Sequence, residues 1–209
     1  MNIYSAYYRQ EGERANFLLL QQARRKDDTD IILSFIADKN DACERLLVWF
    51  REELTGYYRD IGFQGAEGLK KGVDSELKRI SSRNPEIEYG GLIIVGDEYL
   101  GFCRGHYGIY LSVNMFLRDR MTTLIKGDNA EKCMISGRFS GNLGMLLCND
   151  AYYEAVNKYM DRDELTAVLK AEKGLEERRV EKRFRELSER IDVGSRAMSA
   201  VYIAVTEGE

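Results

Sequence analysis

The sequence predicts an α+β protein in which antiparallel sheets pack against layers of helix. Three observations indicate this class. Short apolar runs typical of buried strands occur near the start, in the middle and at the end of the chain. Between them lie segments whose apolar residues recur at helical spacing. The length of 209 residues suits a single domain over 1–209 with a substantial core.

The first third of the chain is predicted to hold strands followed by a helix. Residues 17–20 and 31–37 are short apolar runs, and the second is rich in β-branched and aromatic residues. Asn40 or Asp41 is expected to cap a helix that closes near Gly56. The apolar residues of this helix are Cys43, Leu46, Leu47, Phe50 and Leu54.

A second helix is expected before Pro85, the only proline of the chain. Its apolar residues are Leu69, Val73, Leu77 and Ile80. The following residues read as an antiparallel meander, because turn signals alternate with apolar runs. The expected strands are 92–95, 99–103, 109–113 and 116–117. The polar, glycine-containing stretch 122–144 is expected to be a loop with little strand content.

The last third is predicted to place helices between two strands. In order, we expect a strand at 145–148, helices from Tyr152 and at 163–169, a charged helix that contains EERRVEKRFRELSER and ends at Gly194, and a strand at 198–205. One face of the charged helix carries Leu175, Val180, Phe184, Leu187 and Ile191. Its charged residues therefore indicate a solvated face with i,i+4 pairs rather than a nucleic-acid arm.

Composition excludes several classes of function. The net charge is −4 and the pI is near 5.4, which argues against nucleic-acid binding through bulk positive charge. No apolar run is long enough to span a membrane and no export signal is visible, so we expect no membrane partner and a cytoplasmic location. The four cysteines form no CxxC pair and His106 is the only histidine, so neither a zinc site nor a disulfide framework is expected. Ser-His-Asp catalysis would require His106 itself, which we interpret as a turn residue, and no phosphate-binding glycine motif is present.

Five segments resemble, in the same order, elements of the PPM (PP2C-type) metal-dependent Ser/Thr protein phosphatases. Residues 92–112, LIIVGDEYLGFCRGHYGIYLS, resemble the central hairpins of that family. MLLCNDAYYEAV at 145–156 resembles its "LLLCSDGLYEAV" element, and GSRAMSAVYIAV at 194–205 resembles its closing "GSRDNATAVVIRV" strand. IILSFIADKND at 31–41 matches the place of "FIVADGMGG", and the early "R-x-x-x-E-D-A" element corresponds to residues 9–15.

This resemblance implies a PP2C-like αββα sandwich, in which two antiparallel sheets lie between pairs of helices. It also implies a pair of Mn or Mg ions held by aspartates at the edge of the sandwich. In the family, a metal-bound water attacks phosphoserine or phosphothreonine directly. Hard dications require oxygen ligands, and two neighbouring ions require anions that bridge them.

The resemblance also implies that the metal site is degenerate. Asp38 and Asp150 keep two of the family's aspartates. Arg14 and Arg196 stand where the family has two others, and Lys39 replaces a glycine whose carbonyl is a ligand. Side-chain cations would thus stand where the relatives recruit metal ions, and an arginine can pair directly with a carboxylate.

The first hypothesis is therefore a catalytically inactive PP2C-like module of bacterial type, which regulates or binds a phosphorylated protein or another partner of a kinase pathway. It has no catalytic residue, no expected cofactor and only vestigial metal ligands at Asp38 and Asp150. The phosphate-binding candidates are Arg9, Arg14, Lys39 and Arg196, Arg9 by its match to the family's phosphate-contacting arginine. The second hypothesis is an active phosphatase with Mn or Mg at Asp38 and Asp150. A third is an interaction protein whose partner binds a sheet edge or the tyrosine-rich surface.

Overall fold

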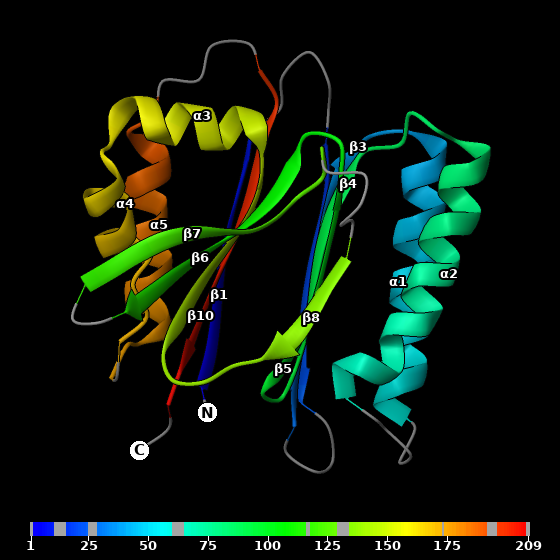
Figure 1. The fold of residues 1–209 in the computed structure, drawn as a ribbon, viewed down its shortest axis with the longest axis horizontal. Helices are drawn as coiled ribbons and strands as arrows, with labels where there is room; N and C mark the ends of the chain where they lie inside the picture. The colour runs from blue at the N-terminus through cyan, green and yellow to red at the C-terminus, as the bar shows by residue number, and fades with distance from the viewer. Residues whose placement is uncertain are drawn as a thin grey trace.

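Two antiparallel sheets lie face to face between two layers of helices in the computed structural model (Figure 1). It describes residues 2–10, 16–24, 29–59, 65–115, 118–128, 134–172, 174–191 and 196–207. One sheet has the order β1(Asn2–Gln10), β10(Met198–Thr206), β9(Leu143–Asn149), β6(Tyr107–Met115), β7(Arg118–Lys126). The other has the order β2(Asn16–Arg24), β3(Asp30–Asp38), β4(Tyr89–Val95), β5(Glu98–Arg104), β8(Met134–Arg138). The predicted αββα sandwich is confirmed.

The helices cover the outer face of each sheet. Helices α1(Asp41–Arg59) and α2(Gly65–Arg83) pack on the β2–β8 sheet. Helices α3(Asp150–Tyr159), α4(Arg162–Val168) and α5(Glu177–Glu189) pack on the β1–β7 sheet. Among the described helices, none is both long and apolar enough to cross a membrane.

Three apolar layers form the core, because the strands bury both faces. In β3, Ile31, Leu33 and Phe35 point toward α1 and α2, whereas Ile32 and Ile36 point into the space between the sheets. This follows from the period-two alternation of side chains along a strand. Continuous apolar runs such as 31–37 and 198–205 therefore mark the central strands of the sandwich.

Most predicted elements are confirmed, and the cap of α1 is Asn40, whose Oδ1 accepts the Cys43 amide at 2.9 Å. The predicted meander is wrong. β4 and β5 form a hairpin, but β5 then pairs with β8, whereas β6 pairs with β7 and β9 of the other sheet. The chain changes sheet at residues 105–106, where Gly105 has a φ of 71°. Local turn signals do not reveal whether two successive strands share a sheet.

Three smaller predictions also differ from the structure. β1 was not predicted, because an edge strand buries few residues and its sequence shows no continuous apolar run. The stretch 122–144 is not mainly loop, since it contains the end of β7, all of β8 and the start of β9. Gly56 lies inside α1, which continues to Arg59. The predicted strand at 116–117 lies outside the described residues, as does Gly194. The charged helix α5 ends before that glycine, at Glu189.

The buried thiols and phenols predict a loss of stability at alkaline pH. Burial raises the pKa of Cys43 to about 12 and raises the pKa values of Cys103, Cys148, Tyr107, Tyr110, Tyr152 and Tyr202 above their ordinary 9.0 and 10.0. The unfolded chain loses these protons first, so it binds fewer protons than the folded chain above pH 9. We expect urea unfolding midpoints to be constant near pH 8 and to fall above pH 9. Each group lowers the free energy of unfolding by about 1.4 kcal/mol per pH unit over the range in which it is deprotonated in the unfolded chain but still protonated in the folded chain.

Tyr110 offers a control for this effect. Its hydroxyl is buried without a hydrogen-bond partner among the described residues. Tyr110→Phe should therefore leave stability unchanged or slightly higher at pH 7, because no hydrogen bond is lost. It should also reduce the loss of unfolding free energy above pH 9 by the contribution of one tyrosine. A midpoint that stays constant to pH 11 in the unmodified protein would contradict the prediction.

Candidate functional site

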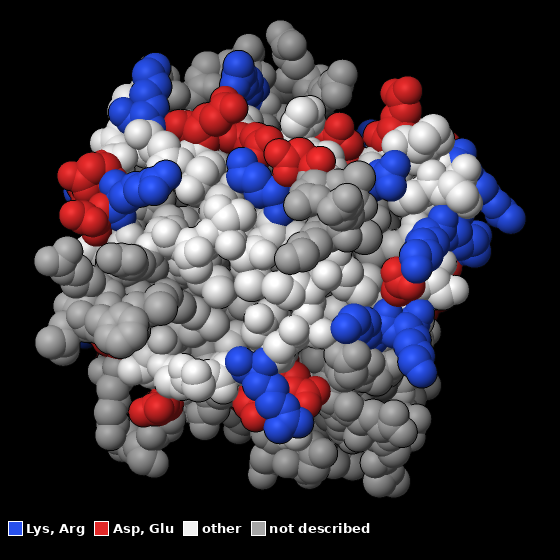
Figure 2. Space-filling model, viewed as in Figure 1, with Lys and Arg blue, Asp and Glu red and all other residues white. Residues whose placement is uncertain are grey.

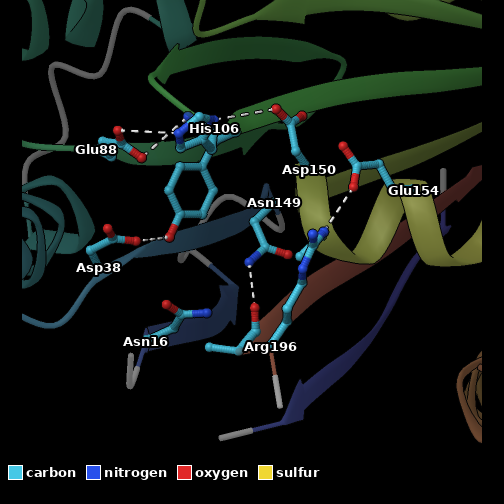
Figure 3. Close-up of a pocket in the computed structure, with 11 residues that line it drawn as sticks. Asn16, Asp38, Glu88, His106, Asn149, Asp150, Glu154 and Arg196 are labelled. Atoms are coloured by element: carbon cyan, nitrogen blue, oxygen red, sulfur yellow. Dashed lines mark hydrogen bonds and ion pairs between the residues drawn. The ribbon is translucent and has the colours of Figure 1, made fainter. Parts of the chain in front are cut away.

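A cavity of about 610 Å³ opens at one edge of the sandwich, where both sheets end (Figure 3). It brings together Asp38, the last residue of β3, and Asp150, the first residue of α3. Asp38 belongs to one sheet, whereas Asp150 directly follows β9 of the other sheet, and the two residues are distant in sequence. The lining residues are Asn16, Asp38, Glu88, His106, Tyr107, Asn149, Asp150, Ala151, Glu154, Arg196 and Ala197.

His106 lies between two carboxylates at the point where the chain changes sheet. Its Nδ1 is 3.6 Å from Asp150 Oδ2, and its Nε2 is 3.7 Å from Glu88 Oε1. Its backbone carbonyl accepts the Asp150 amide at 2.8 Å, so the turn also anchors the start of α3. The side chain is 75% exposed, which agrees with its interpretation as a turn histidine.

Asp38 already has a partner within the protein. The buried Tyr107 donates a hydrogen bond from its hydroxyl to Asp38 Oδ1 at 2.8 Å. Burial raises the pKa of Tyr107 well above its ordinary value, and the negative charge of Asp38 raises it further. The phenol therefore remains a hydrogen-bond donor at neutral pH. Tyr107 belongs to β6, so this bond ties the two sheets together at the cavity.

Asn149 connects three elements beneath the cavity. Its Oδ1 accepts the Tyr152 amide at 3.2 Å as the N-cap of α3, and also the Ser199 amide of β10 at 3.3 Å. Its Nδ2 donates to the Ala197 carbonyl at 2.9 Å. Nearby, the buried Asn16 donates to Ser199 Oγ at 3.0 Å and so joins β2 to β10. The floor of the cavity is therefore a satisfied hydrogen-bond network.

This network predicts a stability loss in Asn149→Ala. The variant removes the α3 cap and leaves the buried Ser199 amide without its acceptor, which should cost about 2 kcal/mol. Urea unfolding at pH 7 would measure the change. Asn157→Ala is the matched control, because Asn157 is exposed and bonds only to the Tyr153 carbonyl of its own helix. Equal midpoints for the two variants would contradict the prediction.

Arg196 lines the cavity from the segment that precedes β10. Its Nη1 is 3.0 Å from Glu154 Oε2, and both side chains are mostly exposed. Glu154 lies one helical turn after Asp150 on the same face of α3. The resemblance places a ligand aspartate at position 196. The structure has Arg196 there, at the cavity and paired with Glu154.

Among the described residues, the other predicted cations do not line this cavity. Arg9 lies on β1 and lines a different groove, next to α5. Lys39 is exposed and is not a lining residue. Arg14 lies outside the described residues. Of the three phosphate-binding candidates that the structure describes, Arg196 alone lines the cavity.

Several lining residues were not predicted. Glu154 could have been found, because it follows Asp150 at i+4 in a predicted helix. Asn149 directly precedes Asp150 and was part of a recognised segment. Glu88 and Tyr107 carry no local signal, since they reach the cavity only through the pairing of β3 with β4 and the packing of the two sheets.

Acidic side chains dominate this edge. Figure 2 shows a band of Asp and Glu along the upper edge of the molecule, with fewer Lys and Arg beside it. Among the residues that the structure describes, four carboxylates line the cavity, from Asp38, Glu88, Asp150 and Glu154, against one guanidinium, that of Arg196. Yet no three His, Cys, Asp or Glu side chains in the described ranges are grouped as metal ligands. The described part of the chain thus brings several carboxylates to this edge without grouping three of them.

The fold is that of a known class of protein. The chain has the fold of PP2C-type Ser/Thr phosphatases, with the cavity at the edge where both sheets end. One similar structure is PppA, a regulatory component of the type VI secretion system in Pseudomonas aeruginosa. It has 12% identity, a TM-score of 0.58 and coverage of 98% of this chain and 99% of that one. No protein-family model matches the sequence, and no curated protein is similar to it.

Two further phosphatase structures show the same likeness. The serine/threonine phosphatase of S. agalactiae has 10% identity and a TM-score of 0.60, with 99% of this chain and 100% of that chain covered. The catalytic domain of the phosphatase PstP, solved with two manganese ions, has 13% identity and a TM-score of 0.58, with coverage of 98% and 99%. At identities this low, the structural likeness establishes a shared fold.

Proposed function

We propose that this chain is a catalytically inactive PP2C-like module with a regulatory or phosphoprotein-binding role in Ser/Thr phosphorylation signalling. The observation that carries the proposal is the state of the cavity. Arg196 pairs there with Glu154, Asp38 accepts a hydrogen bond from Tyr107, and Asp150 lies beside His106. Tyr107 and His106 thus lie against the two aspartates that the resemblance would assign to metal ions, and Arg196 pairs with a further carboxylate of the same cavity.

The pairing supports inactivity for an electrostatic reason. Arg196 reduces the attraction that the lining carboxylates exert on a dication near Asp38 and Asp150, because its positive charge lies at the same cavity. The dication would also have to displace the Tyr107 hydroxyl from Asp38. A metal-activated water nucleophile needs a stable metal position, and the described donors do not supply a set of three ligands.

The proposed partner is a phosphorylated protein or another member of a kinase pathway. The similar solved structures are bacterial phosphatases, and one is described as a regulatory component. The acidic lining of the cavity, however, disfavours capture of a phosphate group at that place, so loss of hydrolysis and phosphoprotein binding are separate parts of the proposal. A labelled phosphopeptide should distinguish these properties, since binding through the cavity would weaken in Arg196→Ala and not in Arg138→Ala at the β8 edge.

Calorimetric titration of the metal-free protein with Mn²⁺ tests the inactive state. We expect no site-specific heat from the unmodified protein and the same trace from an Asp38→Asn/Asp150→Asn double variant, which keeps the side-chain volumes. Phosphopeptide hydrolysis with Mn²⁺ should equal the buffer rate. Micromolar Mn²⁺ binding that is lost in the double variant, together with hydrolysis abolished by Asp150→Ala, would overturn the proposal.

The second candidate is an active phosphatase with a reduced metal site. It is favoured by one observation, namely that Asp38 at the end of β3 and Asp150 at the start of α3 line the same cavity. These two aspartates would hold a Mn or Mg ion, whose chemistry is to activate water. This candidate requires hydrolysis that a chelator abolishes. Hydrolysis that is indifferent to chelator and to the loss of both aspartates would exclude it.

A further inference from the structure

The two sides of the sandwich differ in how their edge strands are protected. β7 and β8 form the edges on one side, where β7 carries four charged residues in nine and β8 has only five residues. β1 and β2 form the edges on the other side, where each has nine residues and a single charged one. Long edge strands with few charges and no proline are open to pairing with another strand. In Figure 1, the β7 and β8 edges face the viewer.

A groove of about 620 Å³ follows the outer side of β1. Residues 5–9 of β1 line it together with Leu20 of β2 and one side of α5. Tyr7, in the middle of this stretch, is 63% exposed, the largest exposure among the large hydrophobic residues that the structure describes. Within the described strands, β1 pairs only with β10, so its other edge faces this groove.

The helix side of the groove is acidic. Glu177, Glu181 and Glu189 of α5 line it and form no ion pair with any described residue. They lie at intervals of one or two helical turns, so their carboxylates form a row along β1. Arg185 is the one cation of α5 in this lining. The opposite side of the groove is the apolar side chain of Leu20.

We propose that β1 is a docking edge for an extended, basic segment of a partner protein, which adds to the sheet as a further strand. Side chains of a strand alternate between its two faces. Lysine or arginine at alternate positions would meet the glutamates of α5, while the apolar residues between them would cover Leu20. The main chain would pair with the free edge of β1, as in other strand-addition complexes. Residues 5–9 set the length of the segment at about five residues.

The charges favour this occupant over a second copy of the chain. Pairing of β1 with β1 of another copy would bring two α5 helices together, each with three unpaired glutamates at the groove. β1 itself would supply only Arg9 as a cation. A basic segment neutralises the glutamate row, whereas a second copy adds to it. The groove is separate from the cavity that holds Asp38 and Asp150, so this inference is independent of the proposed function.

The test uses the full chain and a fluorescein-labelled peptide of three Lys-Val repeats, followed by anisotropy. We expect saturable binding, weakened at least tenfold in a Glu177→Lys/Glu181→Lys double variant. Glu52→Lys/Glu86→Lys is the control with the same change in net charge, because both residues are exposed on the α1–α2 side. It should bind the peptide as the unmodified protein does. Hydrogen exchange should slow in residues 2–10 when the peptide is bound.

Three results would overturn the proposal. The first is equal binding of the Lys-Val peptide by both double variants, or no binding by the unmodified protein. The second is equal binding of a Glu-Val peptide of the same length. The third is a dimer in sedimentation experiments that Tyr7→Lys dissociates, since this would assign the edge to a second copy. Tyr7→Lys is expected to fold normally because the side chain is largely exposed.

Discussion

Replacing Arg196 by aspartate should create a divalent-metal site at the cavity. The substitution removes a guanidinium that pairs with Glu154 and adds a carboxylate beside Asp38 and Asp150. It also frees Glu154 as an additional oxygen donor. Since the local charge becomes more negative by two, Mn²⁺ affinity should rise on the order of 100-fold over the unmodified protein. Calorimetric titration of metal-free protein would measure it.

Arg190→Asp is the matched control for this experiment. Arg190 pairs with Glu164 at 3.3 Å on the exposed surface, so the two substitutions change the same kind of ion pair and the same net charge. Arg190 does not line the cavity, and its replacement should leave Mn²⁺ affinity unchanged. Equal affinities for both variants would mean that Arg196 does not control the metal affinity of the cavity, and the proposed electrostatic block would fail.

Gly144→Ala should destabilise the fold by about 3 kcal/mol or more. A Cβ at this position in β9 would overlap with the backbone carbonyl oxygen of Leu169, at the end of α4. That carbonyl also accepts the hydroxyl of the buried Tyr202 at 2.8 Å. The methyl group therefore has to push the end of α4 away from the sheet and strain this hydrogen bond. Urea unfolding at pH 7 would measure the loss.

Gly72→Ala is the control for the glycine substitution. Gly72 lies inside α2, is exposed, and has no neighbouring atom within 4 Å of the point where the alanine methyl group would lie. Alanine there should raise stability by about 1 kcal/mol, because it has the higher helix propensity. A Gly144→Ala variant as stable as the unmodified protein would show that α4 packs less closely on β9 than the structure indicates.

The sequence identified the cavity residues that lie in recognisable segments. Asp38 ends an apolar run and precedes a helix cap, and Asp150 follows a second apolar run and begins a helix. Local signals, namely strand burial and helix capping, place both aspartates at the ends of elements. Their assignment to a site came from the resemblance to the phosphatase family. Arg196 was identified through the resemblance to the phosphatase family, and the structure places it at the same cavity.

The arrangement of strands needed the tertiary structure. The turn at 105–106 has the same local signals whether the chain stays in one sheet or crosses to the other. The partner of β5 is β8, more than thirty residues later, and only the packing of the two sheets decides that choice. The same packing brings Glu88 and Tyr107 to the cavity and leaves Arg9 beside α5.

The sequence by itself thus determined the α+β class, the positions of most helices and strands, and the two aspartates that end in one cavity. Tertiary structure decided which sheet each strand joins, which cations reach the cavity and which edge strand stays open. The physical reason is the sequence distance over which each interaction acts. Helix capping and apolar periodicity act between neighbours along the chain. Pairing of strands and charges across the sandwich depends on residues that come together only when both sheets pack.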